Sequence, residues 1–328
     1  MRVVITGVSG THKLESIQRV AGELRGKGHN VILLDAWEAI QAAAKHMGRS
    51  VKKETILDLK DLDSLRAVAF SEISESVRNF KNSESSHALV ATHACFRWNK
   101  YLRRGFDLHY LQKIDPDVYV NLVDDITQVV GRLNSDTQWK ERLTESEIIT
   151  WRDEETFLTE MIAEVQNKRF YLLARAEPVE TLVNLISEPK MKKIYLSYPI
   201  TAILQQDPKL LEEVEAFGNE LRTKYVVFNP LSIKDLVGNA DKNSENLKSL
   251  RENTVWRDFK LINQSDMVVV YYPSEYNSPG VNQEINYGFS NGKKVHLFYP
   301  HALSPFWDER VSITHRYNTL EEMRKALL

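Results

Sequence analysis

The sequence has very little cysteine: Cys95 is the only one in 328 residues. An intramolecular disulfide is therefore excluded, and so is a metal site built from several thiolates. No apolar run approaches the roughly 18 residues that span a bilayer. Neither positive nor negative charge is in large excess, because the formal net charge is only −2. We expect neither a membrane nor a nucleic acid as a partner.

The composition is otherwise that of an ordinary globular protein, with 42% hydrophobic and 27% charged residues. The opening residues MRVVITG read as a strand and lack the basic start and long apolar run of a signal peptide. We therefore expect a cytoplasmic protein. A chain of 328 residues is long for a single core, so two domains are expected.

The first half alternates strands with helices. A β-branched strand at 3–6, a glycine-containing turn, a helix at 14–25 and a strand at 31–34 form a βαβ unit. Further strands are predicted at 87–92, 118–123 and 170–175. A short polar segment containing proline, residues 187–190, then interrupts the pattern.

After this segment the alternation restarts, with strands predicted at 193–196, 226–229, 267–271 and 295–298. The predicted fold class is therefore α/β, with two doubly wound parallel-sheet domains. We place the domains at residues 1–188 and 192–328.

The loop after the first strand partly matches a phosphate-binding P-loop. Gly7, Gly10 and Lys13 occupy motif positions, whereas His12 replaces the second glycine and Leu14 replaces the hydroxyl residue. Leucine cannot ligate magnesium, and a side chain at position 12 crowds a turn that favours glycine. Phosphoryl transfer needs that metal to neutralise phosphate oxygens, so we expect no kinase activity.

Four segments give the first half a family resemblance: VVITGVSGTHK at the start, LDSLRAV around Asp63 and Arg66, VATHA at 90–94 and WRDEE at 151–155. The half resembles the archaeal-type adenylate kinases among the P-loop nucleoside monophosphate kinases. Ala91 stands where that family has an acidic residue, and residues 95–106 replace a segment with glycine and proline.

This resemblance implies a P-loop kinase-like fold and a nucleotide site at Gly7, Gly10, Thr11, Lys13, Arg66 and Arg152. Because the motifs are degenerate, two roles stay open. The domain is either a scaffold or dimerisation surface, or a regulatory site that binds a nucleotide without turning it over. For His93 in VATHA we expect a structural role.

The stretch from Trp256 to Pro300 carries the strongest functional signal. It predicts a helix, a buried strand, a polar loop, a helix opening near Gly280 and a further strand. Ligands of open α/β sheets lie in the crevice outside the carboxyl ends of the strands, where loops lead into helices. Ser278, Asn282 and Glu284 stand at that position, and we expect Glu284 in the first helical turn.

Four segments carry a family resemblance in the second half: KIYLSYPI, RDFKLINQSDMVVVYY, SPGVNQEINYGFSNGKKV and HLFYP. With them the half resembles the nucleoside 2-deoxyribosyltransferase superfamily, including its nucleoside 5'-monophosphate N-glycosidase branch. The resemblance implies a flavodoxin/Rossmann-like domain and a homo-oligomer. It also implies that Glu284 is the nucleophile, Asp258 the second acidic residue and Tyr195 the residue that orients the glutamate.

The residue types suit this chemistry independently of the resemblance. Cleavage of an N-glycosidic bond creates positive charge on the anomeric carbon, which a carboxylate stabilises or captures. The departing base needs a proton, which a second carboxyl group supplies. Further substrate contacts are expected at Ser278, Gly280, Asn282, Tyr198 and Asp266.

Structural alternatives remain for each of these residues. Glu284 in a first turn stabilises the helix dipole, and Asp258 pairs with Arg257 or Lys260. Asp266 caps the start of a strand, and Tyr195 packs in the sheet. Tyr198 and Pro199 also replace a glycine of the family, which narrows the loop that would meet the substrate.

The leading hypothesis is cleavage or transfer of the N-glycosidic bond of a nucleoside or nucleoside 5'-monophosphate through a glycosyl-glutamate intermediate. The alternatives are a nucleotide-binding regulatory protein and a nucleoside monophosphate kinase with an altered P-loop. The glycosyl chemistry requires no cofactor or metal, while a nucleotide is expected in the N-terminal domain. The nine histidines show no pair at metal-ligand spacing.

Overall fold

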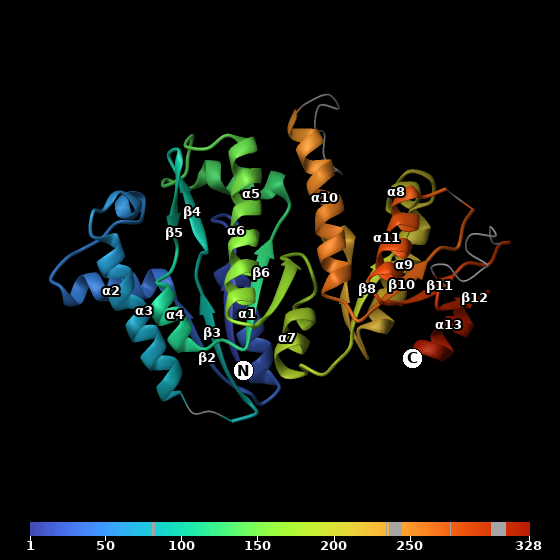
Figure 1. Cartoon of the computed structure of the whole chain (residues 1–328), viewed down its shortest axis with the longest axis horizontal. Helices are drawn as coiled ribbons and strands as arrows, with labels where there is room; N and C mark the ends of the chain where they lie inside the picture. The colour runs from blue at the N-terminus through green and yellow to red at the C-terminus, as the bar shows by residue number, and fades with distance from the viewer. Residues whose placement is uncertain (81–82, 234, 236–244, 276, 303–312) are drawn as a thin grey trace. The chain divides into compact units, whose positions relative to one another are not determined.

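The structure is a computed structural model that describes the chain except for residues 81–82, 234, 236–244, 276 and 303–312. It divides into two compact units (Figure 1). The first contains Met1–Ser187 and Ile233–Leu250, and the second contains Glu188–Ser232 and Arg251–Leu328. Among the described residues, no helix is both long and apolar enough to cross a membrane.

The first unit is built on a five-stranded sheet in the order β2-β3-β1-β6-β7, in which every pair is parallel. The strands are β1 (Arg2–Thr6), β2 (Asn30–Asp35), β3 (Ser86–Ala91), β6 (Val118–Val123) and β7 (Arg169–Ala174). All side chains of β3 and β6 are buried, as expected for strands with helices on both faces. β1 lies at the centre, so the loop after it opens in the middle of the sheet.

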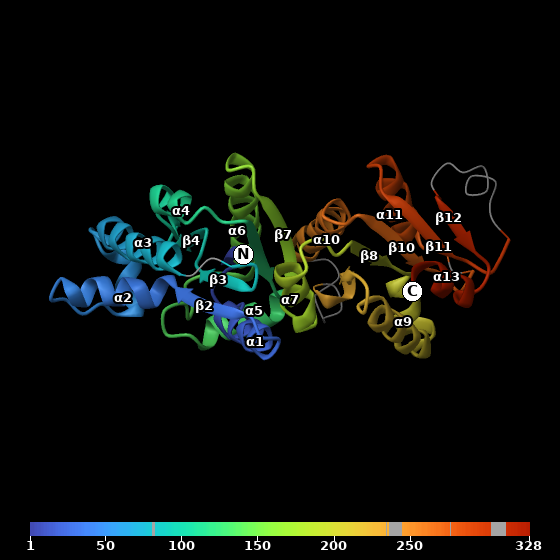
Figure 2. The ribbon, with the colours of Figure 1, turned by 90° about the horizontal axis from the view of Figure 1, so that it is seen from below.

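The helices of this unit lie on both sides of the sheet. They are α1 (Lys13–Gly26), α2 (Ala36–His46), α3 (Leu62–Asn79), α4 (Leu108–Ile114), α5 (Ile126–Ser135), α6 (Glu145–Val165) and α7 (Val179–Ser187), with the short η1 (Lys53–Asp58). Figure 2 shows α3, α4 and α6 on one side of the sheet and α1 and α7 on the other. Phe70 of α3, Ile114 of α4 and Ala163 of α6 share a core with Val4 and Val90 of the sheet.

A hairpin occupies the segment that departs from the adenylate kinase pattern. β4 (Cys95–Trp98) pairs antiparallel with β5 (Tyr101–Arg104), and β4 contacts α6. Gly105 follows directly, and a Cβ atom there would lie 2.1 Å from the carbonyl oxygen of His93. Only glycine allows the end of the hairpin to approach the β3 loop this closely.

The second unit also has a parallel five-stranded sheet, in the order β12-β11-β10-β8-β9. Its strands are β8 (Lys193–Ser197), β9 (Val226–Phe228), β10 (Met267–Tyr271), β11 (Lys294–Phe298) and β12 (His315–Tyr317). Its helices are α8 (Ile200–Gln206), α9 (Pro208–Leu221), η2 (Pro230–Ser232), α10 (Glu245–Asn263), α11 (Pro279–Ser290) and α13 (Leu320–Leu327), of which α10 begins in the first unit. In order along the chain, this is the flavodoxin-like arrangement 2-1-3-4-5.

The two faces of the second sheet have different partners. Ile194, Leu196 and Val269 share a core with residues of α9 and α13. The opposite face meets α11, where a Cβ atom on Gly288 would lie 2.7 Å from the Val268 side chain, so glycine permits close packing. Figure 2 shows α11 on one side and α9 and α13 on the other.

The predicted fold class, two α/β units with parallel sheets, is confirmed. The helix with Glu284 differs in one detail that matters for function. Ser278 is its N-cap and Pro279 its first residue, so Glu284 lies in the second turn rather than the first. The expectation of a first-turn position was wrong, because Ser278 and Pro279 begin the helix and Glu284 is its sixth residue, beyond a first turn of 3.6 residues.

Candidate active site

Three side chains converge at the switch point of the second sheet, where the strand order reverses between β8 and β10. Tyr195 and Ser197 are two residues apart on β8 and therefore point to the same face. The Tyr195 hydroxyl donates to Oε1 of Glu284 at 3.0 Å, and the Ser197 hydroxyl donates to Oε2 at 2.5 Å. Tyr195 and Ser197 are completely buried, whereas Glu284 keeps part of its surface exposed. Both oxygens of the carboxylate are thus held from the sheet side.

A second carboxylate acts electrostatically on the first. Burial, and then the charge of Asp258, raise the pKa of Glu284, while the hydrogen bonds from Ser197 and Tyr195 lower it. Asp258 lies on α10 with its side chain 15% exposed, and its Oδ1 is 3.4 Å from Nε of Arg257. Burial and the two carboxylates also raise the pKa of Tyr195 far above its usual value, so its hydroxyl stays protonated and donates.

The second-turn position of Glu284 weakens its main structural alternative. The effect of the helix dipole on a charge falls off within the first turn, and α11 has no acidic residue there. A helix-stabilising glutamate would face solvent, whereas this one faces two buried hydroxyl donors. Its two donors fix the orientation of the carboxylate.

The other predicted substrate residues fall into two groups. Ser278 caps α11 by accepting from the Val281 amide at 3.4 Å. A Cβ atom on Gly280 would meet nothing within 4 Å, so the start of the helix is open. Asn282 lies in the first turn, and its buried Oδ1 has no hydrogen-bond partner among the described residues. These three residues stand at the same helix start as Glu284.

Tyr198 and Asp266 lie elsewhere. Tyr198 is buried in the core on the opposite face of the sheet, and its hydroxyl donates to the side chain of Asn229 at 2.8 Å. Strand alternation explains this, because Tyr198 is out of phase with Tyr195. Asp266 precedes β10 at the amino edge of the sheet, where its carboxylate accepts from the Lys193 amide at 2.7 Å. The structure brings neither residue to Glu284.

Two aromatic residues, Trp256 and Tyr287, lie on the helices that carry Asp258 and Glu284. Tyr287 stacks on Phe259 with centroids 4.0 Å apart, and Trp256 is 67% exposed. Tyr276 lies outside the described residues. Sequence reasoning missed Ser197, although its spacing of two residues from Tyr195 was a usable signal.

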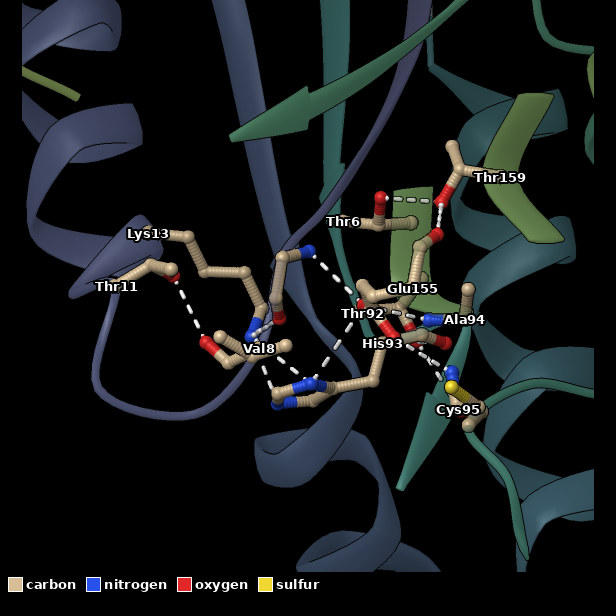
Figure 3. Close-up of polar contacts among 12 residues, drawn as sticks. Thr6, Val8, Thr11, Lys13, Thr92, His93, Ala94, Cys95, Glu155 and Thr159 are labelled. Carbon is tan, nitrogen blue, oxygen red and sulfur yellow. Dashed lines mark hydrogen bonds and ion pairs between the residues drawn. The ribbon is translucent and has the colours of Figure 1, made fainter. Parts of the chain in front are cut away.

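In the first unit, side chains of the loop after β1 and of α1 form hydrogen bonds to the loop backbone and to His93 (Figure 3). Gly10 and His12 have φ angles of 85° and 52°, a region that favours glycine. The Lys13 amine donates to the Gly7 carbonyl at 3.0 Å and contacts Nε2 of His93 at 2.7 Å. The buried Thr11 hydroxyl donates to the carbonyl of Val8 at 2.9 Å.

Glu155 of α6, a residue outside the predicted site, connects this loop to the loop after β3. Its carboxylate is 1% exposed and accepts backbone N–H groups from Gly7 at 3.0 Å, Ala94 at 2.8 Å and Cys95 at 2.7 Å. Burial raises its pKa, and the bonds and Lys13 oppose that rise. Burial also lowers the pKa of Lys13 to about 8.

The two predicted phosphate-binding arginines are engaged as well. Arg66 is 3% exposed and donates to Asp63 at 2.5 Å. Arg152 is buried against Asp235, with 2.9 Å between Nη1 and Oδ2. Within the described residues, no group of three or more histidine, cysteine, aspartate or glutamate side chains is placed to hold a metal ion.

The raised pKa of Glu284 predicts a pH-dependent stability difference. Between the unfolded value of about 4.3 and the raised folded value, the folded state binds more protons than the unfolded state. The free energy of unfolding therefore falls as pH rises through this window. Glu284→Gln removes this contribution. We therefore expect the melting temperature of the variant to increase relative to that of the wild type as pH rises from 5 to 8.5.

Thermal unfolding across that pH range checks this expectation. Glu213→Gln is the matched control, because Glu213 of α9 also accepts a tyrosine hydroxyl, from Tyr271 at 2.8 Å, on the opposite face of the sheet. A difference between Glu284→Gln and wild type that stays constant with pH would contradict the expectation.

None of the compared family models matches the chain, and no curated protein sequence matches it. A similar solved structure is a 2-deoxyribosyltransferase of Bacillus psychrosaccharolyticus, with 20% identity and a TM-score of 0.32 over 40% of this chain and 90% of that one. Another is a CMP N-glycosidase of Clostridium botulinum, with 21% identity and a TM-score of 0.27 over 42% and 98%. A shikimate kinase of Bacteroides thetaiotaomicron has 14% identity and a TM-score of 0.35 over 58% and 98%.

These proteins are of the two kinds that the sequence resembles, a deoxyribosyltransferase or N-glycosidase and a kinase. Identities below 25% bear on the fold alone, and TM-scores this low carry no argument about activity. The function must therefore be argued from the residues of the site.

Proposed function

We propose that the second unit cleaves or transfers the N-glycosidic bond of a nucleoside or nucleoside 5'-monophosphate. One observation supports the proposal: the carboxylate of Glu284 accepts hydrogen bonds from two buried hydroxyls at the switch point of the sheet. The negative charge of Asp258 acts on the same carboxylate and raises its pKa. Paired carboxyl groups in such a crevice suit displacement at a sugar carbon. This chemistry needs neither a cofactor nor a metal.

In the first step a Glu284 oxygen attacks the anomeric carbon. The bond from that carbon to the base nitrogen breaks, its electron pair goes to the nitrogen, and Asp258 supplies the proton that neutralises the base. Burial and mutual repulsion disfavour two ionised carboxylates, so the pair retains one proton to higher pH than isolated groups would. The hydrogen bonds from Tyr195 and Ser197 favour the ionised form of Glu284, which is the form that attacks the sugar.

In the second step water or another base attacks the same carbon and releases the glutamate. Asp258, now ionised, accepts the proton of the attacking group. Water gives hydrolysis, and a second base gives transfer. The start of α11 supplies the subsite for the 5' end of the sugar, because free N–H groups at a helix N-terminus bind hydroxyl or phosphate oxygens and Gly280 leaves the approach open.

A mixture assay tests this function directly. The full chain is incubated with pooled nucleosides and 5'-nucleotides, and free bases are followed by chromatography. Free base indicates hydrolysis, and a nucleoside with an exchanged base indicates transfer. If no base is released from any member while nucleotides still bind, the glycosyl function is refuted and a binding protein becomes the better description.

A second function, nucleotide binding without turnover, is favoured by a cavity in the first unit. The cavity opens to solvent and encloses about 560 Å³ when that open space is counted, and its lining combines the loop residue Ser9, the rings of Trp37 and Phe96, and the cations Lys53 and Arg66. Arg66 is buried, and its Nε has no hydrogen-bond partner among the described residues. A buried guanidinium beside aromatic rings suits a ligand with a planar ring and one anionic group. Lys13 is already engaged by Gly7 and His93, so we infer that the ligand is a monophosphate rather than a triphosphate.

Substitution of Arg66 tests this second function. Arg66→Gln is expected to weaken binding of a nucleoside monophosphate to the first unit about tenfold or more, because a charged hydrogen bond is lost. Calorimetric titration of the Glu284→Gln protein with a nucleoside monophosphate should show two binding sites per chain. Adding Arg66→Gln should weaken binding at one of them. Arg104→Gln is the matched control, since Arg104 also pairs with Asp63, at 3.5 Å, but is exposed. Equal affinities in both variants would refute this site.

A further inference from the structure

Ser197 lies beside the carboxylate of Glu284. It is completely buried at the carboxyl end of β8, and its hydroxyl donates to Oε2 of Glu284 at 2.5 Å. Tyr195 holds Oε1 from the same face of the same strand. A buried strand residue has little freedom to move, so both carboxylate oxygens have fixed donors on the sheet side and each keeps a further lone pair.

We propose that Ser197 is a positioning residue that fixes the orientation and charge of the Glu284 carboxylate and assists its departure from the sugar. The proposal rests on the glycosyl function proposed above and assigns a residue to its second step.

The electrostatic surroundings explain why this donor is needed. Among the described residues, Asp258 on α10 acts on Glu284, and Asp258 and Arg257 of the same helix act on Tyr195 of β8. Burial and Asp258 oppose ionisation of Glu284, whereas the Ser197 and Tyr195 bonds favour it and thereby lower its pKa. Loss of the Ser197 bond therefore shifts the balance toward the protonated carboxyl, which cannot act as a nucleophile.

The bond also bears on the second step. When water attacks the anomeric carbon, the bond from that carbon to the glutamate oxygen breaks, the electron pair returns to the carboxylate, and a water proton goes to Asp258. A hydroxyl donates more strongly to a carboxylate than to a neutral ester. The Ser197 bond thus strengthens as the ester breaks, which speeds release of the sugar.

The test compares Ser197→Ala with Ser197→Thr, which retains a hydroxyl. Ser265→Ala is the matched control, because Ser265 is 2% exposed in the same unit and its hydroxyl donates to the Leu261 carbonyl at 2.7 Å. The first readout is a carbon-13 NMR titration of the Glu284 carboxyl, assigned by its loss in Glu284→Gln. Ser197→Ala should raise that pKa by about one unit, Ser197→Thr should restore it, and Ser265→Ala should leave it unchanged.

The second readout is kinetic. Slower release of the sugar should lower kcat about tenfold and KM with it, and intact-protein mass spectrometry should find more glycosyl adduct in Ser197→Ala than in wild type. An unchanged carboxyl titration in Ser197→Ala overturns the positioning role, whether or not the protein releases base. A shifted titration without adduct in an active enzyme overturns the leaving-group role. Absence of base release by the wild type refutes the glycosyl function and the leaving-group role with it, while the titration still decides whether Ser197 controls the charge of Glu284.

Discussion

Replacement of Glu284 by glutamine is expected to lower the rate of base release by on the order of 10⁴-fold or more, because the amide cannot form the glycosyl ester. Glutamine keeps the shape of the side chain and can still accept from Tyr195 through its carbonyl oxygen. Substrate binding should therefore survive, so the loss appears in kcat rather than KM. Base release measured by chromatography, with nucleotide binding measured separately, checks both parts.

Two further variants sharpen this result. Glu213→Gln removes the other glutamate that accepts from a strand tyrosine, on the opposite face of the sheet, and should leave the rate unchanged. Asp258→Asn should slow base release about 10²- to 10⁴-fold when the departing base needs a proton. The rate should fall much less for a base that departs without one. Base release by Glu284→Gln at close to the wild-type rate would eliminate the covalent mechanism.

Replacement of Glu155 by alanine is the second large effect, on stability rather than chemistry. Its buried carboxylate is the acceptor for three backbone N–H groups, those of Gly7, Ala94 and Cys95. Alanine would leave all three donors buried without this partner, at a cost of about 1–3 kcal/mol each before relaxation. We expect the free energy of unfolding of the first unit to fall by about 3–5 kcal/mol, which urea unfolding of the full chain would measure.

The adjacent glutamate is a built-in control. Glu154 forms an ion pair with Arg97, and both side chains are between 20% and 25% exposed. Glu154→Ala should cost about 1 kcal/mol or less, as do most ion pairs near the surface. Equal losses in the two variants would show that the three backbone bonds of Glu155 do not hold the loops after β1 and β3 together.

The fold class was readable from the sequence because it depends on local pattern. Continuous apolar runs such as 118–123 identify strands that are buried on both faces, and their alternation with helices requires parallel sheets. The departures from the P-loop motif were also readable from the sequence alone, because the side chain of Leu14 cannot bind magnesium in any fold. The motif around Glu284 identified the catalytic candidate for the same reason, although the start of its helix was placed too late.

The partners of the site residues were decided by the tertiary structure. Glu155 lies far along the chain from Gly7 and Cys95, and no periodicity indicates that one carboxylate would serve both loops. The sequence predicts a substrate contact at Tyr198, but the alternation of β8 turns this side chain toward the opposite core. The same alternation brings Ser197 to Glu284. A strand pattern shows which residues share a face. The order of strands in the sheet then determines what that face meets, because parallel neighbours are joined by long crossovers rather than by sequence proximity.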